Sequence, residues 1–265
     1  MNMYLHELRT YRKNTLLWAV SLGAATALFM AMYTVFAKDA PLITELLKGF
    51  SDAVKKAFGM TPEVMTSLNG FYSFVLGFIV LCGAVQAMNL GISVLAREAT
   101  GKTADFLLTK PVTRAEVLTA KLLAVLTHLA ATSALILLVA SVSAFAVEPG
   151  GFDFGTFLLM SLTFFWVQLI FAALGFVTAA VVPKIRSVLP VALSVVFAFY
   201  IAGMAGAALG DGRLYYLSPF KYFDLVYVAQ NASYELSYAV VAAAVVVAAV
   251  AAGYIVFTRR DVHAA

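Results

Sequence analysis

The sequence contains little charge, one cysteine and none of the common hydrolase motifs. Only 12% of its 265 residues are charged, whereas 63% are hydrophobic, and the mean hydropathy is +0.93. Soluble domains are nearer a quarter charged, so an ordinary soluble domain is excluded. The single Cys82 excludes an intrachain disulfide. Neither Gly-x-Ser-x-Gly nor His-Glu-x-x-His occurs, and no catalytic residue is predicted.

Long apolar runs fill most of the chain. Runs of about 20 residues or more are long enough to cross a bilayer as helices. We therefore expect an all-α, polytopic membrane protein that forms one transmembrane domain over residues 1–265. The six expected spans cover about 16–37, 70–96, 117–147, 156–182, 188–209 and 238–257.

Three stretches between or before the spans have the pattern of interfacial helices. Residues 2–14 place apolar side chains on one helical face, which predicts an elbow lying flat at the membrane surface before the first span. Residues 46–58 predict a second interfacial helix, stopped by Gly59 and Pro62. The aromatic-rich residues 215–227 predict short re-entrant helices that close the external side.

The basic residues predict an orientation. With six spans both termini share a side, and that side carries 12 Lys and Arg residues against 6 on the other. The positive-inside rule then places both termini and the 97–116 loop in the cytoplasm. The net charge of +4 therefore reads as an orientation signal, and nucleic acid is not an expected partner. Because the charged side chains fall outside the spans or at their ends, a proton pump or voltage sensor is disfavoured.

The polar segment 97–114, between the second and third spans, carries the most specific pattern. Glu98 precedes a turn at Gly101-Lys102-Thr103, followed by an apolar stretch at 105–108 and a stop at Pro111-Val112-Thr113-Arg114. Thr113 and Glu116 have the spacing of a capping box at the start of the third span. Lys121 follows in that span.

These motifs resemble the cytoplasmic loop of ABC-2 type permeases, the membrane subunits of type V ABC exporters. The stretches 217–223 and 257–261 and the six-span layout fit the same family. The nearest branch is the one that includes the copper permease of nitrous oxide reductase maturation. The resemblance implies that the loop is a coupling helix seated in a groove of a separate ATPase. It assigns coupling to Glu98, Gly101, Lys102, Thr103, Asp105, Phe106, Leu107, Leu108, Pro111 and Arg114.

ATP binding by this chain itself is not expected. The sequence Gly101-Lys102-Thr103 resembles the end of a phosphate-binding loop, but that motif needs glycine at position 96, which is Ala96. No cofactor is therefore predicted in this chain, and ATP and Mg²⁺ are expected in the partner ATPase. The implied assembly holds two ATPase subunits and a second permease copy, identical or not, in a bacterial or archaeal cytoplasmic membrane.

Polar side chains inside the spans offer two interpretations. Gln86, Asn89 and Ser93 form one stripe on the second span, where amides and hydroxyls either join helices by hydrogen bonds or line a cargo path. The resemblance implies that the second and fifth spans line the path, which adds Met204 as a candidate. A small-residue face around Gly203 and Gly206 suits close helix contact.

No metal site is predicted. His128 lies inside the third span without His, Cys or Met partners at ligand spacing. Four methionines gather toward the external half, where gap filling is the commoner role: Met30, Met32, Met60 and Met65.

The function expected from the resemblance is that of a permease subunit of an ATP-driven exporter. The low charge of the spans favours an amphipathic or apolar cargo, such as a peptide, lipid or drug. Two alternatives remain at this stage: a non-transporting membrane anchor or scaffold, and a secondary transporter. The second is disfavoured by the lack of buried charge and of an evident inverted repeat.

Overall fold

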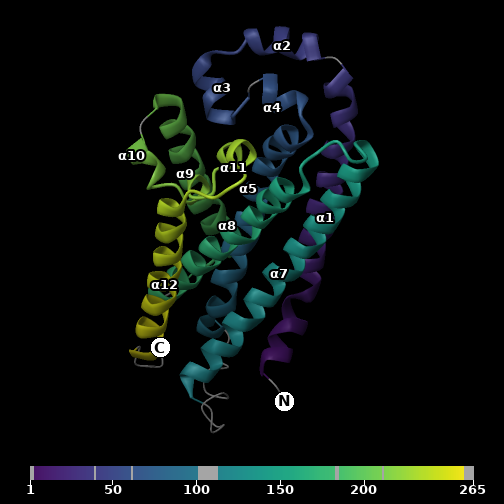
Figure 1. Ribbon diagram of the computed structural model, residues 1–265. Coiled ribbons are helices and arrows are strands. Elements are labelled where there is room, and N and C mark those ends of the chain that lie inside the picture. Colours follow the sequence, from purple (N-terminus) through teal and green to yellow (C-terminus); the bar gives the residue numbers. More distant parts are fainter. Residues whose placement is uncertain are drawn as a thin grey trace.

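The computed structural model is a bundle of long helices with short helices at one end (Figure 1). It describes residues 3–38, 40–60, 62–100, 113–182, 185–210 and 212–259. Both ends of the described chain lie at one end of the bundle, hereafter the termini end, together with the end of α5 and the start of α7. The short helices α2, α3, α4, α10 and α11 lie at the opposite end, hereafter the far end.

Six helices are long and apolar enough to span a membrane. They are α1 (Met3–Lys38), α5 (Leu68–Thr100), α7 (Arg114–Val147), α8 (Phe154–Val181), α9 (Val188–Leu209) and α12 (Leu236–Arg259). The connecting helices are α2 (Ala40–Lys48), α3 (Asp52–Phe58), α4 (Pro62–Thr66), α10 (Gly212–Tyr215), η1 (Pro219–Lys221) and α11 (Leu225–Asn231). No strand occurs in the described ranges.

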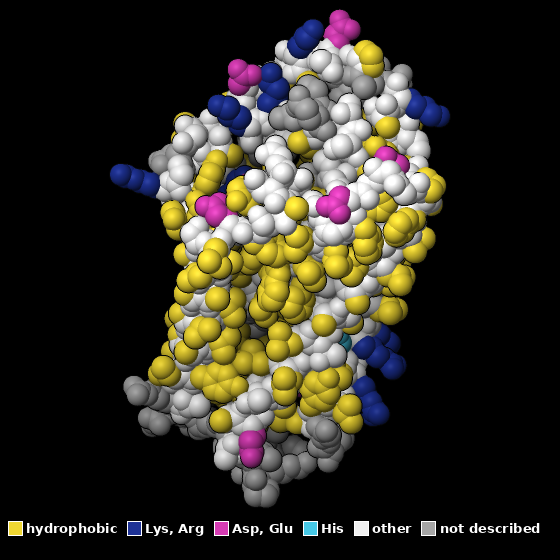
Figure 2. Space-filling view, in the orientation of Figure 1, with side chains coloured by type: hydrophobic (Ala, Val, Ile, Leu, Met, Phe, Trp, Pro, Cys, Tyr) yellow, Lys and Arg dark blue, Asp and Glu magenta, His cyan; other side chains and the backbone are white. Residues whose placement is uncertain are grey.

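The surface agrees with a membrane-spanning bundle. A broad band of hydrophobic side chains crosses the middle of the visible face, and most charged side chains lie toward the two ends (Figure 2). The shortest span, α9, has 22 residues and is therefore about 33 Å long, enough for a hydrocarbon core of about 30 Å. The predicted all-α polytopic fold is confirmed.

The centre of the bundle is the contact between α5 and α8. These two are the most buried spans, whereas α9 and α12 are the least buried. Glycines let their backbones approach: a Cβ atom at Gly91 would lie 2.3 Å from the carbonyl oxygen of Ala172, and one at Gly175 would lie 2.6 Å from that of Met88. Small residues commonly allow close approach of membrane helices, and the glycines have that role at the α5–α8 contact.

The predicted interfacial elbow at residues 2–14 is wrong. Residues from Met3 onward belong to α1, which continues unbroken to Lys38 because neither proline nor glycine interrupts its first turns. Its buried face follows Glu7, Tyr11, Thr15 and Ala19 in steps of four. The elbow prediction grouped Leu5 and Tyr11 on one apolar face, but Leu5 is exposed whereas Tyr11 is buried. The N-terminal turns therefore extend the first span.

The predicted single helix over residues 46–58 is two helices. After α2 ends, Ser51 lies in extended conformation, and its hydroxyl accepts a hydrogen bond from Val54 N, which starts α3. Gly59 ends α3 as predicted, with φ +65°. A further short helix, α4, then precedes α5.

Short helices do form in and around the predicted segment 215–227, as α10, η1 and α11, and their re-entrant position stays a prediction. They explain the small-residue face of α9 differently from the prediction. A Cβ at Gly203 would lie 2.6 Å from Ser218 Oγ, and one at Gly206 would lie 2.9 Å from Leu214 Cβ. This face therefore receives the chain's own 214–221 segment, and Ser218 fixes it by donating a hydrogen bond to Phe199 O at 2.8 Å.

Candidate functional site

The termini end carries the two helices that flank the predicted coupling segment. α5 ends at Thr100 and α7 begins at Arg114. The capping box is confirmed: Glu116 N donates to Thr113 Oγ1 at 3.2 Å, and Thr113 N donates to Glu116 Oε2 at 2.9 Å. The start of α7 is therefore fixed at Thr113 and Glu116.

The predicted coupling residues fall mostly outside the described chain. Glu98 lies in the last turn of α5, and Arg114 is the first residue of α7. The remaining eight lie outside the described residues: Gly101, Lys102, Thr103, Asp105, Phe106, Leu107, Leu108 and Pro111. Their role as a coupling surface stays a prediction.

A buried ion pair joins the three helices at this end. Lys121 Nζ lies 2.8 Å from Glu7 Oε1 and donates a second hydrogen bond to Val94 O at 2.9 Å. The side chain of Lys121 is 4% exposed and that of Glu7 is 11% exposed. Nearby, Tyr11 OH donates to Ser93 O at 3.0 Å. The first turns of α1 and α7 are thus bonded to consecutive carbonyls near the end of α5.

This ion pair contradicts the expectation that no charge is buried in the spans, because Lys121 lies within α7 and is 4% exposed. A lysine inside an apolar span is itself a signal, because such residues are costly in membranes and usually have a partner. The partner could not be found, since Glu7 is 114 residues away and was assigned to a surface elbow. Breaking a buried pair leaves one charge uncompensated, so the contact holds the two flanking helices in one arrangement.

The polar stripe of α5 has two structural environments. Gln86 is buried and belongs to a hydrogen-bonded network among three spans: it donates to Thr132 Oγ1 at 3.1 Å and accepts from Gln168 Nε2 at 3.2 Å. Gln168 also accepts from Ser133 Oγ at 3.2 Å. This favours the interhelical hydrogen-bond interpretation for Gln86.

The other predicted path residues do not gather with it. Asn89 is half-buried, and Ser93 lies nearer the termini end beside a smaller cavity of about 400 Å³. Met204 lies on α9 and lines a different and larger cavity. The structure therefore does not bring the four candidate residues into one site.

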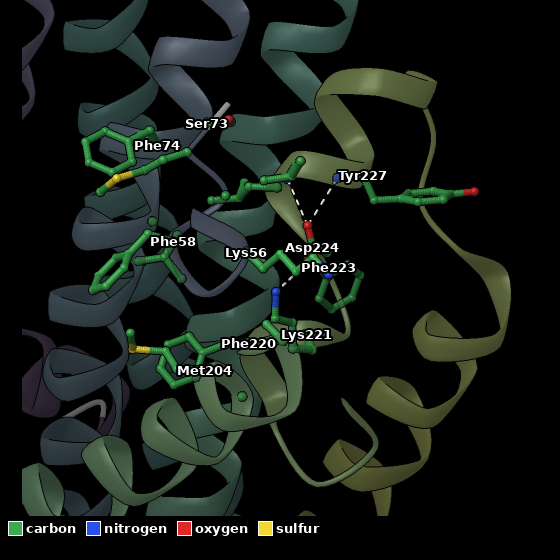
Figure 3. A pocket seen from close by; sticks show the side chains of 18 of the residues that line it. Lys56, Phe58, Ser73, Phe74, Met204, Phe220, Lys221, Phe223, Asp224 and Tyr227 are labelled. Carbon is green, nitrogen blue, oxygen red and sulfur yellow. Dashed lines mark hydrogen bonds and ion pairs between the residues drawn. The ribbon is translucent and has the colours of Figure 1, made fainter. Parts of the chain in front are cut away.

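The larger cavity, of about 870 Å³, lies between α5 and α9 at the far end. α3, α11 and the 215–224 segment complete its walls. Phe58, Phe74 and Met204 lie on one side, and Lys221 and Asp224 lie across from them (Figure 3). Aromatic contacts stabilise the walls: Phe74 and Phe78 meet edge to face at 5.2 Å, and Tyr200 and Phe220 at 5.4 Å.

Two ion pairs lie on the cavity lining. Lys55 Nζ is 2.8 Å from Asp52 Oδ1, and Lys221 Nζ is 2.6 Å from Asp224 Oδ2. The hydrogen bond from Lys55, together with its charge, holds the pKa of the Asp52 carboxyl below its ordinary value. Asp224 also accepts hydrogen bonds from Val226 N and Tyr227 N, which start α11. This second pair therefore fixes the fold of the wall.

Within the described ranges, no group of three His, Cys, Asp or Glu side chains could hold a metal ion. His128 packs edge to face against Tyr11, with ring centroids 6.4 Å apart. Its Nε2 is buried without a hydrogen-bond partner in the described part of the chain. Ring packing between α1 and α7 is the role that this position supports.

Together these features define a multi-pass helical membrane protein, with an ion pair that ties helices at one end and a cavity between α5 and α9 at the other. The family profile for ABC-2 family transporter proteins matches residues 1–262, and the chain belongs to that family. It is thus a membrane permease subunit of an ABC transporter rather than an enzyme, and the family implies association with an ABC ATPase. A comparison with curated proteins found no match.

Proposed function

We propose that this permease subunit moves an amphipathic or apolar cargo, such as a peptide, lipid or drug, outward across the cytoplasmic membrane of a bacterium or archaeon. ATP hydrolysis in a separate subunit drives the movement, and residues 97–114 transmit it. The proposal includes two ATPase subunits, which bind ATP and Mg²⁺, and a second permease copy.

The observation that carries the proposal is the contact among Lys121, Glu7 and Val94 O. A force applied between the ends of α5 and α7 acts on two helices already bonded to each other and to α1. A displacement at the connector is then passed to the spans rather than lost in a local bend. These bonds among α1, α5 and α7 therefore support a coupling role for residues 97–114.

The orientation follows from charge. The basic residues of the termini end include Arg9, Arg12 and Lys13, and those of the far end include Lys48 and Lys56. The excess of Lys and Arg on the termini side supports a cytoplasmic location for both termini and the connector. Reporter fusions at residue 1 and residue 265 test this, since both should report the cytoplasm.

Within the family, the likeness to the copper permease branch rests on the loop motifs alone. Soft-metal cargo would need sulfur or imidazole ligands in the cavity, which offers Met60 and Met204. The same cavity carries three lysines, which disfavour a cation. An organic cargo is the better supported choice.

Affinity purification of the tagged chain from its own cells, followed by mass spectrometry, tests the coupling proposal. We expect an ATPase with a Gly-x-x-x-x-Gly-Lys-Ser/Thr motif to accompany the intact chain. Phe106→Asp and Leu107→Asp should uncouple ATP hydrolysis from transport, with membrane insertion unchanged. Phe50→Asp is the matched control, because it makes the same substitution at an exposed phenylalanine between α2 and α3, outside the proposed coupling segment.

Unchanged transport in both loop variants would refute the coupling role of residues 97–114. Purification without any ATPase would instead support the scaffold alternative.

A further inference from the structure

The far-end cavity has the architecture of a site for a small amphiphile. Its volume of about 870 Å³ lies within the range of about 300–1,000 Å³ that is usual for small-molecule pockets. A polysaccharide or a folded protein does not fit such a space. Its α5 lining runs from Ser73 to Val80, roughly 8–18 Å along the helix from Leu68. The cavity therefore extends from the charged end into the apolar band.

The inner lining is apolar and aromatic. It includes Phe58, Phe74, Phe78, Met204 and Phe220. Methionine and aromatic side chains accommodate flexible apolar groups of varied shape. A hydrocarbon tail is the ligand group that this lining suits.

Gly77 provides part of the open space. A Cβ atom at this position would meet no heavy atom within 4 Å, although Gly77 belongs to one of the two most buried spans. By contrast, a Cβ at Gly83 or Gly91 in the same helix would lie 2.3 Å from a neighbouring atom. The missing side chain at Gly77 is therefore explained by the cavity and not by helix packing.

The charge on the lining is positive. Asp52 and Asp224 each pair with one lysine, Lys55 and Lys221. Lys56 also lines the cavity, is exposed, and forms no ion pair with any described residue. One ammonium group is thus left to pair with a ligand. A carboxylate or phosphate would satisfy it, whereas a cationic head group would be repelled.

We propose that this cavity binds a small anionic amphiphile, with the hydrocarbon tail between α5 and α9 and the carboxylate or phosphate head against Lys56. This assignment narrows the cargo of the proposed function to anionic amphiphiles. It rests on that proposed function only in treating the bound ligand as cargo. The binding itself requires no ATPase and can be measured on the permease alone.

Trp166 provides a local probe. Its ring stacks on Phe223, a cavity-lining residue, at a centroid distance of 6.4 Å. The other tryptophan, Trp18, lies on α1. In a Trp18→Phe chain in nanodiscs of zwitterionic lipid, bound 9,10-dibromostearate should quench Trp166 fluorescence through its bromine atoms. The methyl ester of the same acid is the neutral control ligand.

We expect a saturable quenching component for the acid and a weaker one for the ester. Gly77→Leu, which fills space that no atom occupies, should weaken the saturable component by more than tenfold. Non-saturable quenching by brominated ligand dissolved in the surrounding bilayer should stay unchanged. Lys56→Gln should weaken binding of the acid about two- to fivefold, as for a partly exposed ion pair. Lys48→Gln, on the exposed side of α2 outside the cavity, should leave it unchanged.

Three results would overturn the assignment: no saturable component, a component that survives Gly77→Leu, or equal affinity for acid and ester. The last would leave a neutral amphiphile site in place of an anionic one. None of these results bears on whether an ATPase co-purifies with the chain, so failure of the site and failure of the proposed function are distinguishable.

Discussion

The two ends of the bundle are held together in different ways. At the termini end, α1, α5 and α7 are joined by a buried ion pair and by hydrogen bonds to Ser93 O and Val94 O. At the far end, short helices and aromatic contacts surround an open space of about 870 Å³.

The difference agrees with the separate tasks proposed for the two ends, coupling at one and ligand binding at the other. A buried ion pair adds little net stability compared with an apolar contact, but it penalises any arrangement that separates the charges. Such a contact suits an end that must move as one piece. Aromatic and methionine contacts are less directional and tolerate a change in what they enclose. They suit an end that must admit and release a ligand.

The largest expected effect comes from breaking the tied end. Lys121→Met leaves the Glu7 carboxylate buried without its partner, which should destabilise the folded chain by about 3–5 kcal/mol. Lys55→Met removes a surface pair at the far end and should change stability little. Thermal unfolding of the two variants in detergent, followed by tryptophan fluorescence, measures the difference.

Adding Glu7→Gln to Lys121→Met should recover part of the loss, because no ionised group then remains buried. Equal unfolding temperatures for Lys121→Met and Lys55→Met would show that the ion pair does not hold the termini end.

Alanine substitutions at two glycines of α5 test the difference in packing between the two ends. Gly91→Ala forces a Cβ against the Ala172 carbonyl, so it should destabilise the α5–α8 contact by about 1–3 kcal/mol. Gly77→Ala places the same atom in the cavity, where it meets nothing and should be neutral or slightly stabilising because alanine is the better helix former. If the two variants unfolded alike, the contrast between packed and open regions of α5 would be wrong.

The start of α7 offers a smaller change at the termini end. Thr113→Ala removes the hydroxyl that caps Glu116 N and should cost about 1 kcal/mol. Hydrogen exchange of the first turn of α7 should increase while the middle of the helix stays protected. Thr113→Ser keeps the cap and serves as the matched control.

The smallest expected effect is a pH dependence at the far end. Hydrogen bonds from Thr156 and from the backbone N–H groups of Gly155 and Thr156 lower the pKa of the Asp153 carboxyl, which caps α8. A lowered pKa means that this stabilisation is complete above the unfolded pKa of about 3.9 and is lost as pH falls through the folded pKa. Wild type should therefore exceed Asp153→Asn in unfolding temperature at pH 7, and the difference should vanish in acid. A difference independent of pH would point to the side-chain amide and not to charge.

Local patterns predicted the spans well. The expected bounds of α9 agree residue for residue, and the Thr113–Glu116 capping box and the stop at Gly59 are confirmed, because each depends on residues close in sequence. The predicted elbow at residues 2–14 was wrong because α1 is one continuous helix whose buried stripe begins at Glu7. That stripe is defined by contacts with α5 and α7, which the local sequence does not show.

The candidate site was less predictable for the same reason. The pairing of Glu7 with Lys121 joins residues far apart in the chain. The cavity depends on how several helices pack, which a local sequence pattern does not predict. Gly77 illustrates the limit: in sequence it resembles Gly91, and only the packing separates them.

The central claim is that ATP bound by a separate subunit at the termini end changes the far end through residues 97–114. The most direct measurement is Trp166 emission in the Trp18→Phe permease purified with its ATPase, before and after Mg-ATP. We predict a change in the intact complex and none in the Phe106→Asp complex. An emission that Mg-ATP leaves unchanged in the intact complex, although ATP is hydrolysed, would contradict the claim.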